Sequence, residues 1–207
     1  ATPNNPTGRA MTLPEIERVA AASPGVVVVD EAYVEFNSEP SAVQLIDEHP
    51  NVVVLRTLSK GFGPAGLRLG YLIARPPVVR ELMKARLPFM VDRFAEQTAL
   101  ALLERHDLIE ERVRRMQVSI TEVTEALRRM DKVDVMPTEA NFVIFTTSMP
   151  ADELQDRLTE RGVLVRNMGG YPELEGYLRV SAGTRAENKA FLTALEETLY
   201  PEGVQNA

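Results

Sequence analysis

The sequence predicts an α/β fold in which a mostly parallel sheet comes first and a smaller α+β domain follows. Two observations predict the sheet: Val26–Val29 and Val52–Leu55 are short apolar runs, and a helical stretch lies between them. This is the pattern of a βαβ unit. Strands and helices alternate again in the last third of the chain, and we therefore expect domains at residues 1–92 and 93–207.

Composition excludes several classes of protein. The chain has 207 residues, of which 44% are hydrophobic, a formal net charge of −7 and no cysteine. The negative charge argues against a general nucleic-acid surface. The absence of cysteine excludes disulfides, thiolate metal sites and cysteine nucleophiles, and we expect no metal site. No apolar run approaches the length of a membrane span, so we expect a cytoplasmic protein with no membrane partner.

The chain opens on a turn and a capped helix. Prolines and asparagines in Ala1–Gly8 favour a fixed turn over a helix or a strand. Thr12 is followed three residues later by Glu15, which is the spacing of a capping box, and Pro14 lies in the first helical turn. The helix is expected to end before Pro24.

The first sheet is expected to contain three strands. Val26–Val29 lacks polar residues, so we predict that it is buried on both faces, as strands of parallel sheets are. A short helix at Ala42–Glu48 returns the chain to Val52–Leu55. Tyr71–Ala74 is expected to form the third strand.

The remaining elements follow from periodicity. Apolar residues at spacings of three and four predict a long helix near 108–130, which links the domains or packs on the second one. A coiled coil is the alternative, but about three heptads is short for one. We expect further helices at 78–87, 93–105 and 151–161 and a capped helix from Thr184 to Leu199, with strands at 133–135, 141–145, 163–166 and 177–182.

The stretch after the second strand carries the chemistry. Thr57, Ser59, Arg68 and the amides of a glycine-rich turn can all donate hydrogen bonds to one anion. Lys60 lies among them, and positive neighbours favour a neutral amine, which is a nucleophile for carbonyl groups. The simplest ligand that needs both a phosphate cradle and an amine is pyridoxal phosphate. The alternative is an ordinary solvated lysine in a loop.

The same turn contains a motif of another class of site. Gly61–Gly66 matches G-x-G-x-x-G, the dinucleotide fingerprint, which would indicate a nucleotide-binding oxidoreductase. Pro64 removes an amide from the loop that would hold the pyrophosphate. The acidic residue near the required spacing, Glu81, lies in a helical pattern instead of at a strand end. We therefore reject the dinucleotide interpretation, which tight binding of a nicotinamide dinucleotide would restore.

Several motifs together resemble one family. Asn5-Pro6-Thr7-Gly8, Asp30-Glu31-Ala32-Tyr33, Ser59-Lys60, Arg68 and Arg179 occur in the order found in fold-type I pyridoxal-phosphate aminotransferases, and most closely resemble the histidinol-phosphate aminotransferases. The resemblance runs from the first residue to about Leu199. It implies that residues 1–92 are part of the cofactor-binding large domain. It also implies transfer of an amino group between histidinol phosphate and 2-oxoglutarate or glutamate in histidine biosynthesis.

The resemblance also implies roles for single residues. Lys60 resembles the catalytic lysine, which bonds to the cofactor and moves a proton between the substrate and the cofactor. Asp30 resembles the partner of the pyridine nitrogen, and a carboxylate there keeps the ring protonated. The other expected cofactor contacts are Tyr33 and Asn5 at the phenolic oxygen of the ring, and Thr57, Ser59 and Arg68 at the phosphate.

Two arginines resemble substrate-binding residues. Arg179 resembles the arginine that grips the α-carboxylate of glutamate, since a guanidinium matches a carboxylate in two bonds. Arg166 resembles a second arginine, which binds the phosphate of the other substrate. The alternative for both is an exposed charge on a strand.

Other functions remain open at this point. An aromatic amino-acid aminotransferase and a decarboxylase of a phosphorylated amino acid share the same motifs. A non-catalytic domain that has lost the site is a further alternative, against which Lys60, Asp30 and Arg68 argue. Family members carry a substantial part before the Asn-Pro-Thr-Gly turn, so we expect this chain to be a portion of a longer one. The family also leads us to expect a homodimer.

Overall fold

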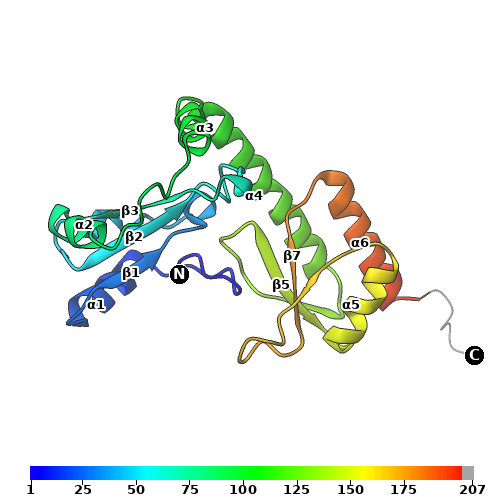
Figure 1. The fold of residues 1–207 in the computed structure, drawn as a ribbon. Coiled ribbons are helices and arrows are strands. Elements are labelled where there is room, and N and C mark those ends of the chain that lie inside the picture. The colour runs from blue at the N-terminus through cyan, green and yellow to red at the C-terminus, as the bar shows by residue number, and fades with distance from the viewer. Residues whose placement is uncertain (202–207) are drawn as a thin grey trace, which may run out of the picture. The chain divides into compact units, whose positions relative to one another are not determined.

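The structure is a computed structural model, which describes residues 1–201. The chain divides into two compact units (Figure 1): Ala1–Asn5 with Arg9–Arg114, and Pro6–Gly8 with the residues from Arg115 onward. The division falls inside helix α4 (His106–Arg128). The assignment of residues 1–92 and 93–207 to two domains stays a prediction.

Helix α1 (Leu13–Ala22) opens the first unit after the N-terminal turn. The carboxylate of Glu15 accepts a hydrogen bond from the Thr12 amide at 2.8 Å, so it satisfies a donor that the helix itself leaves unpaired. Ile16 and Ala20 lie one turn apart on the buried face. The capped start that the sequence predicts is therefore confirmed.

The first unit contains a three-stranded sheet in the order β1-β2-β3. Strand β1 (Val27–Asp30) pairs with β2 (Val52–Thr57) in parallel, and β3 (Gly70–Ala74) joins β2 antiparallel. The register places Asp30 opposite Leu55 and Thr57 opposite Gly70. The carboxyl ends of β1 and β2 therefore lie at one edge of the sheet, as in other α/β folds, and the predicted fold class is confirmed.

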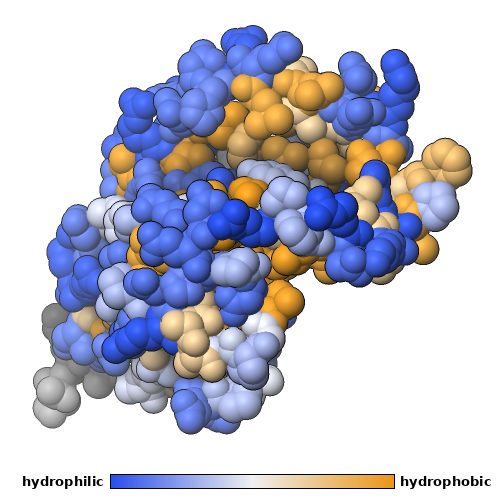
Figure 2. Space-filling view, turned by 90° about the vertical axis from the view of Figure 1, so that its left-hand side faces the viewer, coloured by the Kyte–Doolittle hydropathy of each residue, from blue (hydrophilic) through white to orange (hydrophobic). Residues whose placement is uncertain are grey.

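Central strand β2 is buried on both faces, since Val52, Val53 and Val54 are all buried, whereas β1 is covered on one face only. Val29, Val52 and Val54 pack against α1 and the 3₁₀ helix η2 (Ala42–Leu45). Val28 on the opposite face of β1 is 54% exposed, so the prediction of a strand buried on both faces is wrong. An apolar run shows that a strand can be buried, but not which element covers it. Seen from the side of Figure 1 on which β1 lies, the surface carries many exposed hydrophobic groups (Figure 2).

The other helices of the first unit are short. Two 3₁₀ helices, η1 (Val34–Phe36) and η3 (Ala65–Leu67), follow β1 and β2. Helix α2 (Pro76–Met83) begins earlier than expected, because both of its prolines fit the first turn, and it also ends earlier. Helix α3 (Arg93–Leu103) is capped by Asp92, whose carboxylate accepts the Ala95 amide at 2.9 Å.

The second unit contains an antiparallel sheet in the order β4-β5-β7-β6. Its strands are β4 (Val133–Val135), β5 (Phe142–Thr147), β7 (Tyr177–Ser181) and β6 (Arg166–Asn167). Helices α5 (Ala151–Glu160) and α6 (Arg185–Leu199) and the end of α4 complete a core in which Leu127, Phe145 and Leu195 are fully buried. The capping box at Thr184 and Glu187 is present as expected.

The strand expected at 163–166 is largely wrong. Only Arg166 and Asn167 pair with β7, and Leu164 is 82% exposed. The amide of Val163 instead donates to the Leu158 carbonyl, which closes the end of α5 around Gly162 at φ 76°. Val163, the first residue of the apolar run, therefore belongs to the C-terminal cap of α5 and not to a strand. Among the helices of residues 1–201, none is long and apolar enough to cross a bilayer.

Candidate active site

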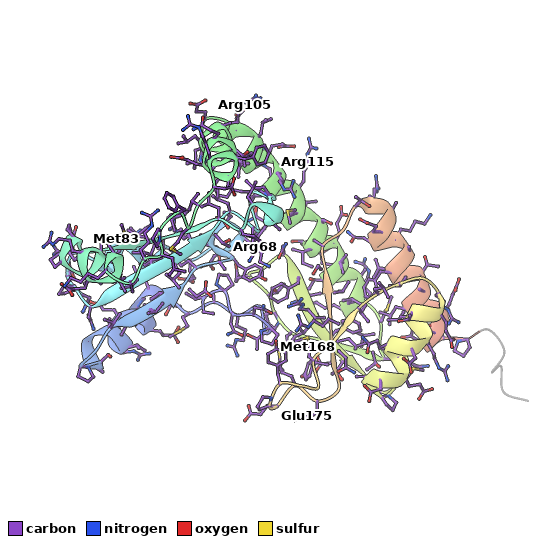
Figure 3. All side chains as sticks on the ribbon, viewed as in Figure 1. Arg68, Met83, Arg105, Arg115, Met168 and Glu175 are labelled. Atoms are coloured by element: carbon purple, nitrogen blue, oxygen red, sulfur yellow. The ribbon has the colours of Figure 1, made fainter. Side chains whose placement is uncertain are left out.

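The loop between β2 and β3 presents Lys60. Thr57 pairs with Gly70, and the Leu58 amide donates to the Leu69 carbonyl at 3.0 Å, so the two strands continue to this point. Ser59 and Arg68 then lie on the two sides of the neck of one loop, and Arg68 is seen there in Figure 3. The register of the sheet thus places Thr57, Ser59 and Arg68 at the base of the same loop.

Lys60 lies over an aromatic ring. Its Nζ is 5.1 Å from the centroid of the Tyr33 ring, and Tyr33 is itself buried at the start of η1. A cation at this distance from a ring is held by the electrons of the ring face. Within residues 1–201, no carboxylate forms an ion pair with this amine. The Tyr33 ring therefore positions the amine, and no carboxylate of the described residues pairs with it.

Asp30 ends β1 at the same edge of the sheet. One of its carboxylate oxygens accepts the Ala32 amide at 3.0 Å, and its side chain is exposed on the open face of the strand. The Asp30 carbonyl accepts the Thr2 amide at 2.9 Å, which ties the N-terminal turn to the end of β1. Asn5 lies in that turn, where the Asn4 amide donates to the Arg9 carbonyl, and it is exposed.

The three expected phosphate ligands, Thr57, Ser59 and Arg68, differ in how many of their hydrogen-bond donors are already bonded within the protein. The Thr57 hydroxyl donates to the Leu69 carbonyl at 3.3 Å and accepts the Ser59 amide at 3.1 Å. Arg68 has a left-handed backbone (φ 51°), and one of its guanidinium nitrogens donates to the Ala65 carbonyl at 3.0 Å. Ser59 and Arg68 keep donors for an anion, whereas the Thr57 hydroxyl is committed to the loop.

These residues fit a cofactor that carries an aldehyde and a phosphate. Lys60 supplies an amine with no ion-pair partner among the described residues, and Ser59 and Arg68 supply donors on one loop. Asp30 supplies a carboxylate at the neighbouring strand end. An amine, an anion site and an acid are the groups that pyridoxal phosphate requires.

The glycines after Lys60 lie against two residues that sequence reasoning missed. A Cβ on Gly61 would lie 2.8 Å from the Cγ of Glu35, and one on Gly63 would lie 2.6 Å from the guanidinium carbon of Arg112. The contact at Gly61 is with the root of the Glu35 side chain and cannot be relieved cheaply, whereas the flexible end of Arg112 could shift away from a Cβ at Gly63. Gly63 is instead favoured there by its φ of 98°. Glu35 lies two residues after Tyr33, and this closeness to the Asp30–Tyr33 motif could have marked it as a residue near the site. No sequence pattern pointed to Arg112.

A buried ion pair behind the site was also missed. Glu31 is 2% exposed, and its carboxylate accepts hydrogen bonds from Arg56 at 2.9 Å and from the Ala42 amide at 2.7 Å. Ser41 donates to the same carboxylate at 2.8 Å. Glu31 therefore ties the start of η2 to Arg56 on β2, the residue directly before Thr57. Its neighbour Asp30 drew attention because it resembles a cofactor ligand, whereas the role of Glu31 depends on residues far along the chain.

The two predicted substrate-binding arginines lie together in the second unit. Arg166 on β6 is the register partner of Arg179 on β7, and directly opposed residues of an antiparallel pair share one face. The Arg179 guanidinium lies 4.9 Å from the centroid of the Phe142 ring. Both arginines line a hollow of about 720 Å³. Two adjacent guanidinium groups favour an anion that carries more than one negative oxygen.

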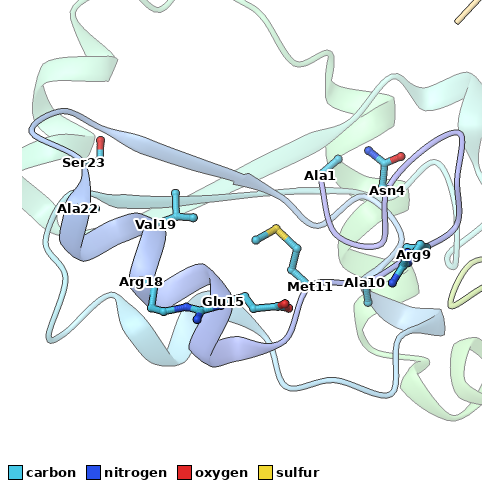
Figure 4. Close-up of a pocket in the computed structure, with 10 residues that line it drawn as sticks. All are labelled: Ala1, Asn4, Arg9, Ala10, Met11, Glu15, Arg18, Val19, Ala22 and Ser23. Atoms are coloured by element: carbon cyan, nitrogen blue, oxygen red, sulfur yellow. The ribbon is translucent and has the colours of Figure 1, made fainter. Parts of the chain in front are cut away.

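A second hollow, of about 880 Å³, lies along α1 in the first unit (Figure 4). Arg9, Met11, Glu15 and Arg18 are among the residues that line it. None of the predicted site residues does so. The chemistry that the sequence predicts is therefore placed at strand ends, and not in this groove.

Comparison with known proteins gives consistent matches. The family model for aminotransferase class I and II matches residues 1–195. The histidinol-phosphate aminotransferase of Chlorobaculum tepidum is 40% identical over 197 residues, which cover 95% of this chain and 56% of that protein. The enzyme of the same name from Streptomyces avermitilis is 44% identical over 200 residues, or 95% of this chain and 53% of that protein. The chain thus spans about half the length of these curated relatives.

Solved structures agree in fold. The histidinol-phosphate aminotransferase from Clostridium acetobutylicum has a TM-score of 0.89 at 25% identity, covering 95% of this chain and 62% of that chain. The enzyme from Sinorhizobium meliloti, solved in complex with pyridoxal-5′-phosphate, has a TM-score of 0.86 at 28% identity over 96% of this chain and 56% of that one. The L-threonine-O-3-phosphate decarboxylase from Porphyromonas gingivalis has a TM-score of 0.84 at 30% identity over 96% and 62%.

Proposed function

Since the chain belongs to the aminotransferase class I and II family, we propose that it serves a pyridoxal-phosphate-dependent transfer of an amino group between histidinol phosphate and 2-oxoglutarate. The observation that carries this proposal is that an amine with no ion-pair partner among residues 1–201, an acid and anion-binding donors all follow the strands at one edge of the first sheet. Curated relatives named histidinol-phosphate aminotransferase support the choice of substrate. Because the chain spans about half of their length, the activity is proposed for the whole protein.

Residues of the first unit would hold the cofactor. Lys60 would bind it covalently, Ser59 and Arg68 would bind its phosphate, and Thr57 would shape the loop around that phosphate. Asp30 would hold the proton of the ring nitrogen, while Tyr33 and Asn5 would donate to the phenolic oxygen. When bound, pyridoxal phosphate supplies an electron sink that lets a proton leave the carbon bearing the amino group.

Lys60 would also move that proton. Its amine is held over the Tyr33 ring and forms no ion pair with a described carboxylate, so it can act as a base once it is free. It would accept the proton that leaves the substrate Cα and hold it for return on the cofactor side of the amino nitrogen. One amine can serve both transfers because it lies at the end of a single flexible side chain.

The paired arginines would serve the anionic ends of the substrates. Arg166 and Arg179 lie opposite each other on β6 and β7 and face one hollow. Arg179 would bind a carboxylate of glutamate or 2-oxoglutarate in one half-reaction, and both arginines would bind the phosphate of histidinol phosphate in the other. The amino donor then leaves as a ketone, and the oxo acid leaves as an amino acid.

Reduction with borohydride tests the central role of Lys60. After incubation with pyridoxal phosphate and reduction, mass spectrometry of the protein should find the added cofactor mass on the peptide that contains Lys60. Lys60→Ala should lose that mass, while Lys84→Ala, which removes an exposed lysine of the same unit, should retain it. Equal labelling of many lysines, or labelling that survives Lys60→Ala, would contradict the proposal.

Substrate choice needs a separate assay. We expect the protein to release the ketone product from histidinol phosphate much faster than from phenylalanine, which would represent the aromatic class. A decarboxylase is the second candidate, because a decarboxylase of a phosphorylated amino acid has nearly the same fold and 30% identity. Release of carbon dioxide from a phosphorylated amino acid, without an oxo-acid acceptor, would favour that candidate.

We also propose that the protein is a homodimer in the cytoplasm, as the family resemblance implies. Analytical ultracentrifugation of the purified protein measures the first property, and cell fractionation measures the second. A single sedimenting species of monomer mass would contradict the dimer.

A further inference from the structure

The carboxyl group of Glu35 has an unusual environment. Glu35 lies in η1, and its Oε2 is buried with no hydrogen-bond partner in the part of the chain that the structure describes. Buried carboxyl oxygens nearly always have a partner, since leaving one unpaired costs free energy. Ionising the Glu35 carboxyl group in this environment is therefore costly, and the cost is felt by the residues that it contacts.

Glu35 touches the turn that carries Lys60. A Cβ on Gly61 would meet the Cγ, Cβ and Cδ of Glu35 at 2.8, 2.9 and 3.1 Å, so the whole side chain lies against the backbone of Gly61. Gly61 directly follows Lys60, and the Tyr33 ring lies 5.1 Å from the lysine amine. The segment Tyr33–Glu35 thus contacts the lysine turn twice, once at its side chain and once at its backbone.

We propose that Glu35 is a positioning residue for Lys60, whose carboxyl group supports the backbone at Gly61 while it is protonated and loosens that support when it ionises. This inference rests on the proposed function of Lys60. It assigns to Glu35 no contact with substrate or cofactor. The effect passes through Gly61 alone.

The charges around Glu35 oppose one another. Burial is the largest influence and raises the pKa of the Glu35 carboxyl above its usual range. A hydrogen bond from the backbone amide of Glu35 and then the charge of Arg56 on β2 lower this pKa, whereas the Glu31 carboxylate raises it, and Glu31 is already bonded to Arg56. From the turn, Lys60 directs its amine to the Tyr33 ring, and from α4 the Arg112 guanidinium lies against Gly63. No described group forms an ion pair with Glu35 itself.

Ionisation of Glu35 therefore has to change its local environment. A carboxylate at this position gains a charge that its unpaired oxygen cannot share with any described donor. Water must reach that oxygen or the side chain must move, and either change separates Glu35 from Gly61. The turn of Lys60 then loses its support as the pH rises through the pKa of Glu35.

Amide hydrogen exchange tests this without requiring catalysis. The protection of the peptide that spans residues 58–64, corrected for intrinsic exchange, is measured from pH 4.5 to 8 in the unaltered protein and in E35Q. We expect protection to fall by about tenfold across this range in the unaltered protein, as for one unpaired buried group. In E35Q, which keeps the shape without the charge, protection should stay constant.

Two further variants serve as controls for the exchange experiment. Glu48→Gln removes an exposed carboxylate of the same unit and should keep the pH dependence of the unaltered protein. Glu35→Met, which fills the space without a titratable group, should be as constant as E35Q, and it replaces E35Q if that variant does not fold. A pH-independent unaltered protein, or a pH-dependent E35Q, would overturn the proposal. If borohydride instead fails to fix pyridoxal phosphate on Lys60, the proposed function fails while the exchange result stands.

Discussion

The two sheets of the molecule differ in how completely they are covered. In the second unit, β5 and β7 pack against helices, and Val143, Phe145 and Leu178 are almost fully buried. In the first unit, β1 is covered on one face only, and its open face carries both Val28 and Asp30. Asp30, one of the residues proposed for cofactor chemistry, thus lies on the uncovered face of β1. The second unit thus has a well-covered sheet, whereas in the first unit one face of β1 is exposed.

The largest effect should come from the core of the second unit. Phe145→Ala removes a fully buried ring that contacts Phe191, and we expect it to lower the free energy of unfolding by about 4 kcal/mol. Val28→Ala, on the open face of β1, should change it by less than about 0.5 kcal/mol. Urea unfolding followed by circular dichroism measures both. A large cost at Val28 would show that this face is covered in solution.

Breaking the buried ion pair should cost nearly as much within the first unit. Glu31→Gln leaves Arg56 and the η2 amide without their carboxylate, and we expect a loss of about 3 kcal/mol. The matched control is Glu153→Gln, which breaks an exposed pair with Arg157 on α5 and should cost less than about 0.5 kcal/mol. Equal effects of the two substitutions in the same unfolding experiment would mean that the Glu31–Arg56 pair does not stabilise the first unit.

The cap of α6 should have a moderate effect. The Thr184 hydroxyl accepts the Glu187 amide, and Glu187 accepts the Thr184 amide at 2.7 Å. Thr184→Ala should therefore lower the thermal midpoint, with a loss of about 1 kcal/mol in the free energy of unfolding. Thr193→Ala, at an exposed position inside the same helix, should leave it unchanged or slightly raised. If both substitutions behave alike, the cap does not contribute.

The smallest effect should be the pH dependence that Glu35 adds to stability. Because burial raises its folded-state pKa, Glu35 binds its proton more tightly when folded. Its contribution is complete below the unfolded pKa and is lost as the pH rises through the folded one. E35Q should therefore gain stability relative to the unaltered protein as the pH rises from 4.5, and the difference should level off above the folded pKa. A difference that is constant with pH in the same urea experiment would contradict this.

Local patterns predicted the elements and much of the candidate site. The apolar spacing of α4, the cap of α6 and the positions of Asp30 and Lys60 at strand ends all follow from neighbouring residues. The roles expected for single residues at the site stay predictions. The failures have a different cause. Coverage of β1 depends on other segments, and the run after Gly162 is used in ending α5.

Contacts between distant residues account for what the sequence could not reveal. Glu31 meets Arg56, and Glu35 meets Gly61, across 25 and 26 positions of the chain. No periodicity or motif spacing encodes such pairs. They depend on the register of β1 and β2, which places the segment after one strand beside the loop after the other.

The fit between Glu35 and Gly61 has a consequence for the history of the protein. Since even a methyl group at position 61 would collide with the root of the Glu35 side chain, neither position can drift alone. A relative that gains bulk at one must lose it at the other or shift the intervening backbone. Substitutions at the two positions should accordingly be found in pairs across descendants of a common ancestor.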